Sequence, residues 1–239
     1  MASARPAPDP LAPAVIARDL DLTYGQGLVV KSVSLEVAAG ETVAILGPSG
    51  GGKSTFLKAV AGLLSPAAGS LEVLGSAAPS RPPSGQVGYV PQRLGLVRHA
   101  SALANVLHGA LPGLPAWRSL VGAYPEEVRE RARQALADVG LAEKAEAPIH
   151  QLSGGQQRRV AVARALVQRP RLLLADEFLG ELDPATVEAV WGAVRRLQQE
   201  TGMTLLVVEH HLDQALRLAD RIFSLKEGHL TAMAVPEDP

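Results

Sequence analysis

Apolar and polar positions along the chain follow two patterns that predict strands. Residues 15–24 and 28–37 alternate between apolar and polar side chains, and Gly25-Gln26-Gly27 lies between them. Alternation is typical of a strand with one buried face, and the short connection predicts an antiparallel pair. Residues 42–46 form instead a short continuous apolar run, as expected of a strand buried on both faces.

Further buried-type strands and helices alternate towards the C-terminus. Leu172–Ala175 and Met203–Val208 are continuous apolar runs, and the segment between them repeats apolar residues at helical spacing from Val187 to Leu197. A strand is also predicted at Val87–Val90. Strands alternating with helices indicate an α/β fold with a mostly parallel sheet.

The hydrophobic pattern changes in the middle of the chain. Residues from about 94 to 151 contain helical segments and no convincing strand. Pro125 followed by two glutamates predicts a helix start, and Gly140 predicts its end. The pattern indicates a helical subdomain inserted at about 94–151 into a single domain of residues 14–239.

Composition narrows the function classes. The chain has 239 residues, a formal charge of -1 and no cysteine. The charge gives no electrostatic case for nucleic-acid binding, and the lack of cysteine excludes thiol catalysis, disulfides and thiolate metal sites. Residues 1–13 read as a disordered Pro/Ala tail, and no apolar run approaches the roughly 18 residues that span a bilayer. We therefore expect a cytoplasmic protein whose attachment to a membrane is through partners.

A glycine-rich loop follows the strand at residues 42–46. It fits the pattern G-x-x-x-x-G-K-[ST], and a helix is predicted from Lys53 to Ala61, closed near Gly62. Glycines let backbone N–H groups converge on a phosphate, and the helix N-terminus adds its dipole. Lys53 would bridge the β- and γ-phosphates, and the Ser54 hydroxyl would ligate Mg²⁺. The loop runs through Gly47, Pro48, Ser49, Gly50, Gly51, Gly52, Lys53, Ser54 and Thr55.

Two acids stand at the end of a second apolar run, where Leu172-Leu173-Leu174-Ala175 is followed by Asp176 and Glu177. Asp176 would hold Mg²⁺ directly or through water, and Glu177 is the candidate to polarise the attacking water. The plainer alternative is that both acids only cap a surface strand, and a phosphate loop in the same chain argues against it.

The hexapeptide Leu152-Ser153-Gly154-Gly155-Gln156-Gln157 completes a set of three motifs. Together they resemble the nucleotide-binding subunit of an ABC transporter, and the resemblance extends from about residue 15 to 230. It implies an α/β P-loop NTPase core with a mostly parallel sheet, an N-terminal antiparallel β subdomain and the inserted helical subdomain.

The resemblance also implies roles for single residues. Tyr24 stands where the family has an aromatic that stacks on adenine, although a core or strand-surface tyrosine is the plain alternative. Gln92 matches the Q-loop, and His210 matches the switch histidine at the γ-phosphate. The expected catalytic residues are Lys53, Gln92, Glu177 and His210, and the expected Mg²⁺ ligands are Ser54, Gln92 and Asp176. The expected ATP contacts are Tyr24, residues 47–55, Gln92, Ser153, Gly154, Gly155, Gln156, Asp176 and His210.

The signature hexapeptide implies a pair of subunits. Ser153 and the two glycines would open a helix through Arg159, Ala163 and Leu166. In the family this terminus caps the γ-phosphate bound by the partner subunit, so two ATP molecules are held between two subunits. The pair can be two copies of this chain or a heterodimer.

Three positions depart from the family pattern. Phe178 replaces the usual proline after the glutamate, the D-loop reads Gly180-Glu181-Leu182-Asp183, and Glu209-His210-His211 surrounds the switch histidine with unusual neighbours. Every catalytic position is nevertheless filled, so the departures put the turnover rate in doubt but not the reaction type.

The helical insert should carry the subfamily, because that region meets the membrane partner. Four segments resemble the ATPase subunits of phosphonate importers. They are Asn105-Val106-Leu107-His108-Gly109-Ala110-Leu111, Trp117-Arg118-Ser119-Leu120, and residues 212–216 and 219–222. Trp117 could equally be a core residue of the insert. The expected partners are a permease, a solute-binding protein and a second nucleotide-binding subunit, at the inner face of the membrane. An exporter subunit and a soluble ABC-type ATPase remain alternatives.

Overall fold

The computed structural model describes residues 12–25, 27–114, 123–180 and 182–233. They form two compact units, one of residues up to Pro83 together with those from Val208 onward, and one of Ser84–Val207. The expected tail of residues 1–13, apart from its last two residues, lies outside the described part, as does Trp117-Arg118-Ser119-Leu120. The expectation of a single domain at 14–239 stays a prediction.

The predicted N-terminal strand pair is confirmed in the first unit. Strands β1 (Val15–Tyr24) and β2 (Gly27–Val37) pair antiparallel, with Val15 opposite Val37. The pairing shifts register, and Asp19 and Ser32 adopt positive φ angles of 45° and 47° beside these irregularities. Strand β4 (Ala68–Val73) joins the other edge of β1, and the short β5 (Ser76–Ala77) joins β4.

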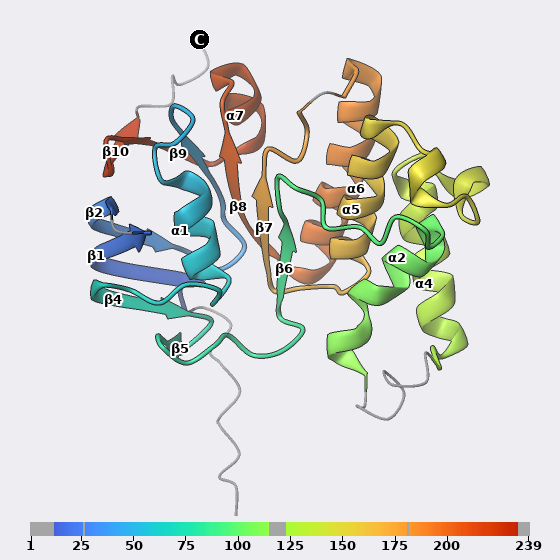
Figure 1. The fold of residues 1–239 in the computed structure, drawn as a ribbon, viewed down its shortest axis with the longest axis horizontal. Coiled ribbons are helices and arrows are strands. Elements are labelled where there is room, and N and C mark those ends of the chain that lie inside the picture. The colour runs from blue at the N-terminus through green and yellow to red at the C-terminus, as the bar shows by residue number, and fades with distance from the viewer. Residues whose placement is uncertain (1–11, 26, 115–122, 181, 234–239) are drawn as a thin grey trace, which may run out of the picture. The chain divides into compact units, whose positions relative to one another are not determined.

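The first unit also contains the strand that precedes the glycine-rich loop. Strand β3 (Thr42–Leu46) is fully buried, as its apolar run predicted, and it pairs parallel with β9 (Arg221–Lys226). Strand β10 (His229–Met233) pairs antiparallel with β9. Helix α1 (Lys53–Val60) follows the loop and packs beside β1, β2 and β4 (Figure 1), while α7 (Leu212–Leu218) packs on β3.

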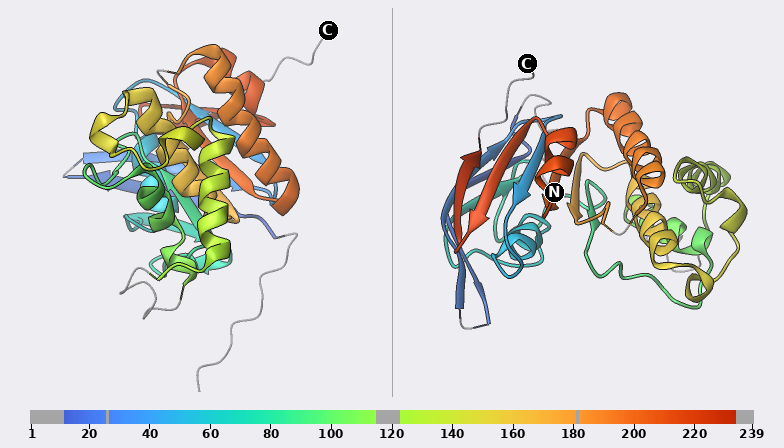
Figure 2. Two further views of the ribbon diagram at one scale, coloured as in Figure 1. Left: turned by 90° about the vertical axis from the view of Figure 1, so that its right-hand side faces the viewer. Right: turned by 90° about the horizontal axis from the view of Figure 1, so that it is seen from above.

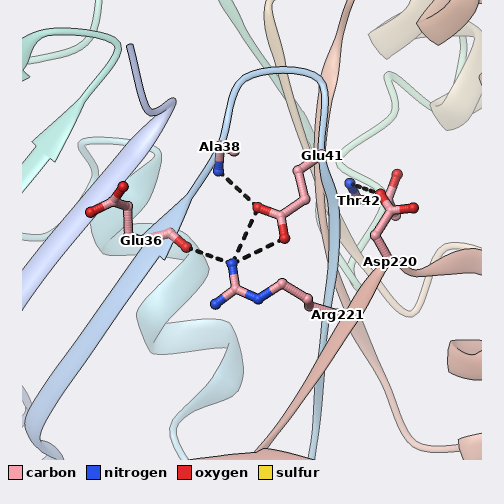
Figure 3. Close-up of polar contacts among 6 residues, drawn as sticks. All are labelled: Glu36, Ala38, Glu41, Thr42, Asp220 and Arg221. Carbon is pink, nitrogen blue, oxygen red and sulfur yellow. Dashed lines mark hydrogen bonds and ion pairs between the residues drawn. The ribbon is translucent and has the colours of Figure 1, made fainter. Parts of the chain in front are cut away.

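Polar contacts fix the start of β3 against the start of β9 (Figure 3). The Arg221 guanidinium donates to a carboxylate oxygen of Glu41 at 3.0 Å and to the Glu36 carbonyl at 3.1 Å. The Asp220 carboxylate accepts from the backbone N–H of Thr42 at 2.8 Å. Because these contacts join residues about 180 positions apart, they hold the strand that leads into the loop in register with β9.

The second unit combines two parallel strands with helices. Strands β6 (Val87–Val90) and β7 (Leu172–Asp176) pair parallel, with Val90 opposite Ala175. Helix α5 (Gly154–Leu166) packs against β6 and also contacts α2, α4 and α6, so it lies at the centre of the helical part (Figure 2). The other helices among the described residues of this unit are α2 (Ala102–Gly109), η1 (Leu111–Gly113), α4 (Glu126–Asp138), η2 (Ala142–Lys144), η3 (Ile149–Gln151) and α6 (Pro184–Thr201).

The helical texture predicted for residues 94–151 is confirmed for its described part, where the only strand-like feature is an isolated bridge between Ser101 and Pro148. Pro125 lies one residue before α4, and Gly140 follows its end with a positive φ of 68°. Strand β8 (Thr204–Glu209) carries the chain from the second unit into the first. Among the described helices, none combines the length and apolar character needed to cross a membrane.

Candidate functional site

The glycine-rich loop packs tightly on neighbouring backbone within the first unit. A methyl group on Gly47 would lie 2.2 Å from the Leu225 carbonyl oxygen, and one on Gly52 would lie 2.6 Å from the Val29 carbonyl oxygen. Gly52 also has a φ of 95°, which a residue with a side chain rarely adopts. The glycines at these two positions are therefore required by the packing of the loop between β2 and β9.

Lys53 lies almost fully buried at the start of α1, with 5% of its surface exposed. Its ammonium donates to the carbonyls of Gly47 at 2.7 Å and Pro48 at 2.9 Å. A buried ammonium must be hydrogen-bonded, and these contacts curl the loop around the lysine head group. The geometry concentrates positive charge within the turn that the glycines form.

The N-terminus of α1 completes this turn. Its N-cap is Gly52, which has no side chain to satisfy the first N–H groups of the helix. Ser54 is half-buried in the first turn, and Thr55 after it is buried. Beside the loop lies a cavity of about 330 Å³, lined by Leu28, Val29, Lys31, Gly50, Gly51, Glu227 and Gly228.

Tyr24, at the end of β1, is 65% exposed, which excludes the alternative that it is a core residue. The Lys58 ammonium of α1 lies 5.5 Å from the centre of its ring. A cation at this distance is attracted by the π face of the ring. One face of the tyrosine is therefore held against α1, in the same unit as the glycine-rich loop.

The two acids lie where the sequence predicted them, at the end of β7 in the second unit. Asp176 is its last residue and is 2% exposed, whereas Glu177 is half-buried and has a positive φ of 53°. The Gln92 amide, just after β6, donates to a carboxylate oxygen of Glu177 at 3.2 Å. Parallel pairing of β6 with β7 thus brings the Q-loop glutamine and the glutamate together.

Burial and charge near Asp176 also affect a residue of β6. Burial, together with the negative charge of Asp176, raises the pKa of Tyr89 to about 12. Both causes act against ionisation of the phenol, since a phenolate would be poorly solvated and repelled by the aspartate. The Tyr89 side chain near Asp176 is therefore uncharged at physiological pH.

The signature hexapeptide opens α5, as predicted. The Ser153 hydroxyl accepts from the backbone N–H of Gln156, and the Gln156 side chain accepts from the backbone N–H of Ser153 at 2.9 Å. This reciprocal capping box fixes the first turn of the helix. Ser153 and Gly154 are both exposed, so the helix N-terminus is accessible to an external group.

Two arginines of α5 were not identified from the sequence. Arg158 donates to the main-chain carbonyl of Glu177, and Arg164 donates to the carbonyls of Leu94 and Gly95 at 2.6 and 2.7 Å. Burial lowers the pKa of Arg164. Their partners are backbone oxygens, which any residue supplies, so no sequence motif could have revealed these contacts.

The positions that depart from the family pattern are accommodated locally. Phe178 is 1% exposed and fills the core of the second unit. Asp183 caps α6 by accepting from the Thr186 backbone and hydroxyl, and these hydrogen bonds lower its pKa. Glu209 is buried at the end of β8, whereas His210 and His211 are exposed. Glu181 lies outside the described residues.

Comparison with known proteins places these motifs in a family. A family model described as ABC transporter matches residues 30–180. The phosphonates import ATP-binding protein PhnC of Escherichia coli O157:H7 is 40% identical over 227 residues, covering 90% of this chain and 87% of the relative. The protein of the same name from Maricaulis maris is 41% identical over 91% of this chain and 86% of its own.

Solved structures agree with the sequence comparison. The ATP-binding cassette MJ0796, as a dimer in a post-hydrolysis state bound to ADP and Pi, superposes with a TM-score of 0.80 at 32% identity. The match covers 94% of this chain and 100% of that one. It confirms the α/β P-loop fold class. The family model spans more than half of the chain and the relatives span nearly all of it, so this chain belongs to the ABC transporter family.

Proposed function

We propose that this chain is the ATP-binding and ATP-hydrolysing subunit that powers an ABC importer of phosphonates or a related oxyanion. The observation that carries the proposal is the 40% identity over 90% of the chain to phosphonates import ATP-binding proteins. That likeness occurs in a chain that retains every expected catalytic side chain.

The glycine-rich loop is the proposed triphosphate site. Its glycines permit an approach of backbone to ligand that a side chain would block, and the N-terminus of α1 favours an anion. Lys53 neutralises the β- and γ-phosphates, and its two carbonyl contacts keep the ammonium aimed into the turn. The proposed contacts are residues 47–55 at the phosphates and Tyr24 at the adenine, on the ring face away from Lys58.

The proposed Mg²⁺ ligands are oxygens of Ser54, Gln92 and Asp176. A hydroxyl, an amide and a carboxylate form a hard oxygen donor set, which suits Mg²⁺. The near-complete burial of Asp176 also fits a cation, because a buried carboxylate is stabilised by positive charge. When bound, the ion neutralises charge on the phosphates and orients them for attack.

Glu177 is the proposed general base. Its half-buried carboxylate lies at the carboxyl end of β7 and accepts a hydrogen bond from Gln92, so its position is defined by two elements. A carboxylate held in this way can accept the proton of an attacking water while the water adds to the γ-phosphate. Exposed His210 is the proposed contact to the γ-phosphate.

Ser153, Gly154, Gly155 and Gln156 are proposed to bind the nucleotide of a second subunit. The exposed N-terminus of α5 is a suitable anion site, and the dimeric form of the MJ0796 cassette supports pairing of two such chains. We take the partner to be a second copy of this chain. Binding would then close the pair, and hydrolysis would release it.

The proposed membrane partner is a permease at the inner face of the cell membrane, fed by a solute-binding protein. The names of the relatives support import, as opposed to export or a soluble role. The solute itself would be recognised by those partners and not by this chain.

Reconstitution with the permease in vesicles tests the assignment. We expect the ATPase rate to rise several-fold when the solute-binding protein is loaded with an alkylphosphonate. This rise corresponds to an activation free energy that is lower by on the order of 1 kcal/mol or more. The control is the same protein loaded with an unrelated solute. Equal ATPase rates in the two arms contradict phosphonate import. An ATPase rate that does not depend on the permease contradicts a role in transport.

A further inference from the structure

The main chain of Glu177 adopts a conformation that needs external support. Its φ of 53° lies in the left-handed region, which a residue with a Cβ atom disfavours. Such a conformation persists only where neighbouring groups hold it, and it occurs preferentially at functional sites. The contacts of Glu177 therefore show what fixes its position.

The contacts reach Glu177 from separate parts of the second unit. Its main-chain carbonyl accepts from the guanidinium of Arg158 and from the backbone N–H of Gly180 at 3.2 Å. Its carboxylate accepts from Gln92 at 3.2 Å. The Gly180 contact is local to the turn, whereas the Arg158 contact ties the backbone of this residue to a distant element.

That element is the signature helix. Arg158 is half-buried in the second turn of α5, whose first turn is fixed by the capping box of Ser153. Further along the same helix, Arg164 donates to the carbonyls of Leu94 and Gly95, in the segment that follows Gln92. Helix α5 thus supports the backbone of the glutamate and also the loop that carries its glutamine partner.

We propose that Arg158 is a positioning residue for Glu177, so that the signature helix sets the orientation of the general base of its own subunit. The inference rests on the proposed role of Glu177. A charged donor on a carbonyl makes a stronger hydrogen bond than a neutral one, and the planar guanidinium fixes its direction. Any displacement of α5, as when its N-terminus binds a partner's phosphate, then displaces the glutamate.

Arg159 offers a matched control on the same helix. It also donates to main-chain carbonyls, those of Val139 at 3.0 Å and Gly140 at 3.2 Å, but these lie at the end of α4. Loss of either arginine removes one cation and its carbonyl contacts from α5. Of these two substitutions, loss of Arg158 removes a contact to Glu177, whereas loss of Arg159 removes contacts to Val139 and Gly140.

The experiment measures kcat and KM for MgATP in the full-length chain with the substitutions Arg158→Met, Arg158→Lys, Arg159→Met and Glu177→Gln. We expect Arg158→Met to lower kcat roughly 10- to 100-fold with KM within about 2-fold of wild type, because a misplaced base impairs chemistry and not binding. Arg158→Lys keeps the cation and should recover part of the loss. Arg159→Met should keep kcat within about 2-fold, whatever its melting temperature.

Each result separates the inference from the proposed function. A wild-type kcat in Glu177→Gln contradicts the role of the glutamate itself. A large loss in Glu177→Gln combined with a near-normal kcat in Arg158→Met overturns the positioning role and leaves the proposed function intact. Equal losses in Arg158→Met and Arg159→Met, or no recovery in Arg158→Lys, also overturn it, since they indicate general support of α5.

Discussion

The ammonium of Lys53 is folded back onto carbonyls of the loop that precedes it. Lys53→Ala removes the buried positive charge at the proposed triphosphate site. We expect the affinity for inorganic tripolyphosphate and for ATP to fall at least 10-fold, or about 1.4 kcal/mol, in a calorimetric titration. Tripolyphosphate is informative because it has no base to contact Tyr24.

The control for that experiment is Lys144→Ala, which removes an exposed lysine of η2 from the other unit. It changes the net charge equally but should leave both affinities unchanged. If Lys53→Ala binds tripolyphosphate with wild-type affinity, the glycine-rich loop is not the triphosphate site.

The raised pKa of Tyr89 makes the stability of the folded chain depend on pH in alkaline solution. The pKa of this tyrosine is raised to about 12 in the folded protein, against a value near 10 in an unfolded chain. The unfolded state therefore loses this proton first as pH rises. The contribution to stability is complete below pH 10 and is lost between about pH 10 and 12.

Tyr89→Phe removes the ionisable group and should reduce the loss of stability across that alkaline window, as measured by urea denaturation at a series of pH values. The spectrum of tyrosinate should also differ between wild type and variant only near pH 12. A difference that develops at pH 10 would mean that the phenol is solvated and distant from Asp176.

Residues that belong to a local sequence motif were predictable from the sequence. Lys53, Asp176 and the Ser153 cap lie where the motifs place them, because each motif fixes both the residue and its neighbouring element. Arg158 and Arg164 could not be predicted. Their partners are carbonyls on segments about 20 and 70 residues away, and no side-chain pattern marks such a partner.

At the scale of elements, the helical part of the second unit depends on close backbone packing between α2 and α5. A methyl group on Gly109 would lie 1.9 Å from the Arg164 carbonyl oxygen. We expect Gly109→Ala to force the two helices apart and to cost roughly 1–3 kcal/mol, although alanine is the better helix former. Thermal unfolding followed by circular dichroism measures the loss.

The matched control is Gly113→Ala, a few residues further on in η1. A methyl group there meets no atom within 4 Å, so the melting temperature should stay close to that of wild type. Equal melting temperatures for the two variants would show that α2 and α5 do not approach as closely as described.

Elements with a clear local hydrophobic pattern were predicted well, and three strands without one were not. The buried strands β3 and β7 and the long helix α6 agree with their patterns to within a few residues. Strands β4, β9 and β10 were not predicted. Strands β4 and β9 pair with strands that are distant in sequence, which a local pattern does not record, and β10 pairs in turn with β9.

At the scale of the whole molecule, the proposed machinery is distributed over both units of the chain. The glycine-rich loop, Tyr24 and His210 belong to one unit, and the acids, Gln92 and the signature helix belong to the other. Likeness to the ABC family, and not any local pattern, is the reason for proposing that these groups serve one ATP site and a second subunit. The resemblance to the ABC family is the source of that relation.

We propose that two copies of this chain hold ATP between the glycine-rich loop of one and the signature helix of the other. The direct test of this proposal is the solution mass of full-length Glu177→Gln with and without MgATP, by size-exclusion chromatography with light scattering. We predict a monomer without nucleotide, a dimer with ATP, and a monomer again when Ser153→Arg is added to block the helix N-terminus. A Glu177→Gln chain that binds ATP in a parallel titration and yet remains monomeric would contradict the account.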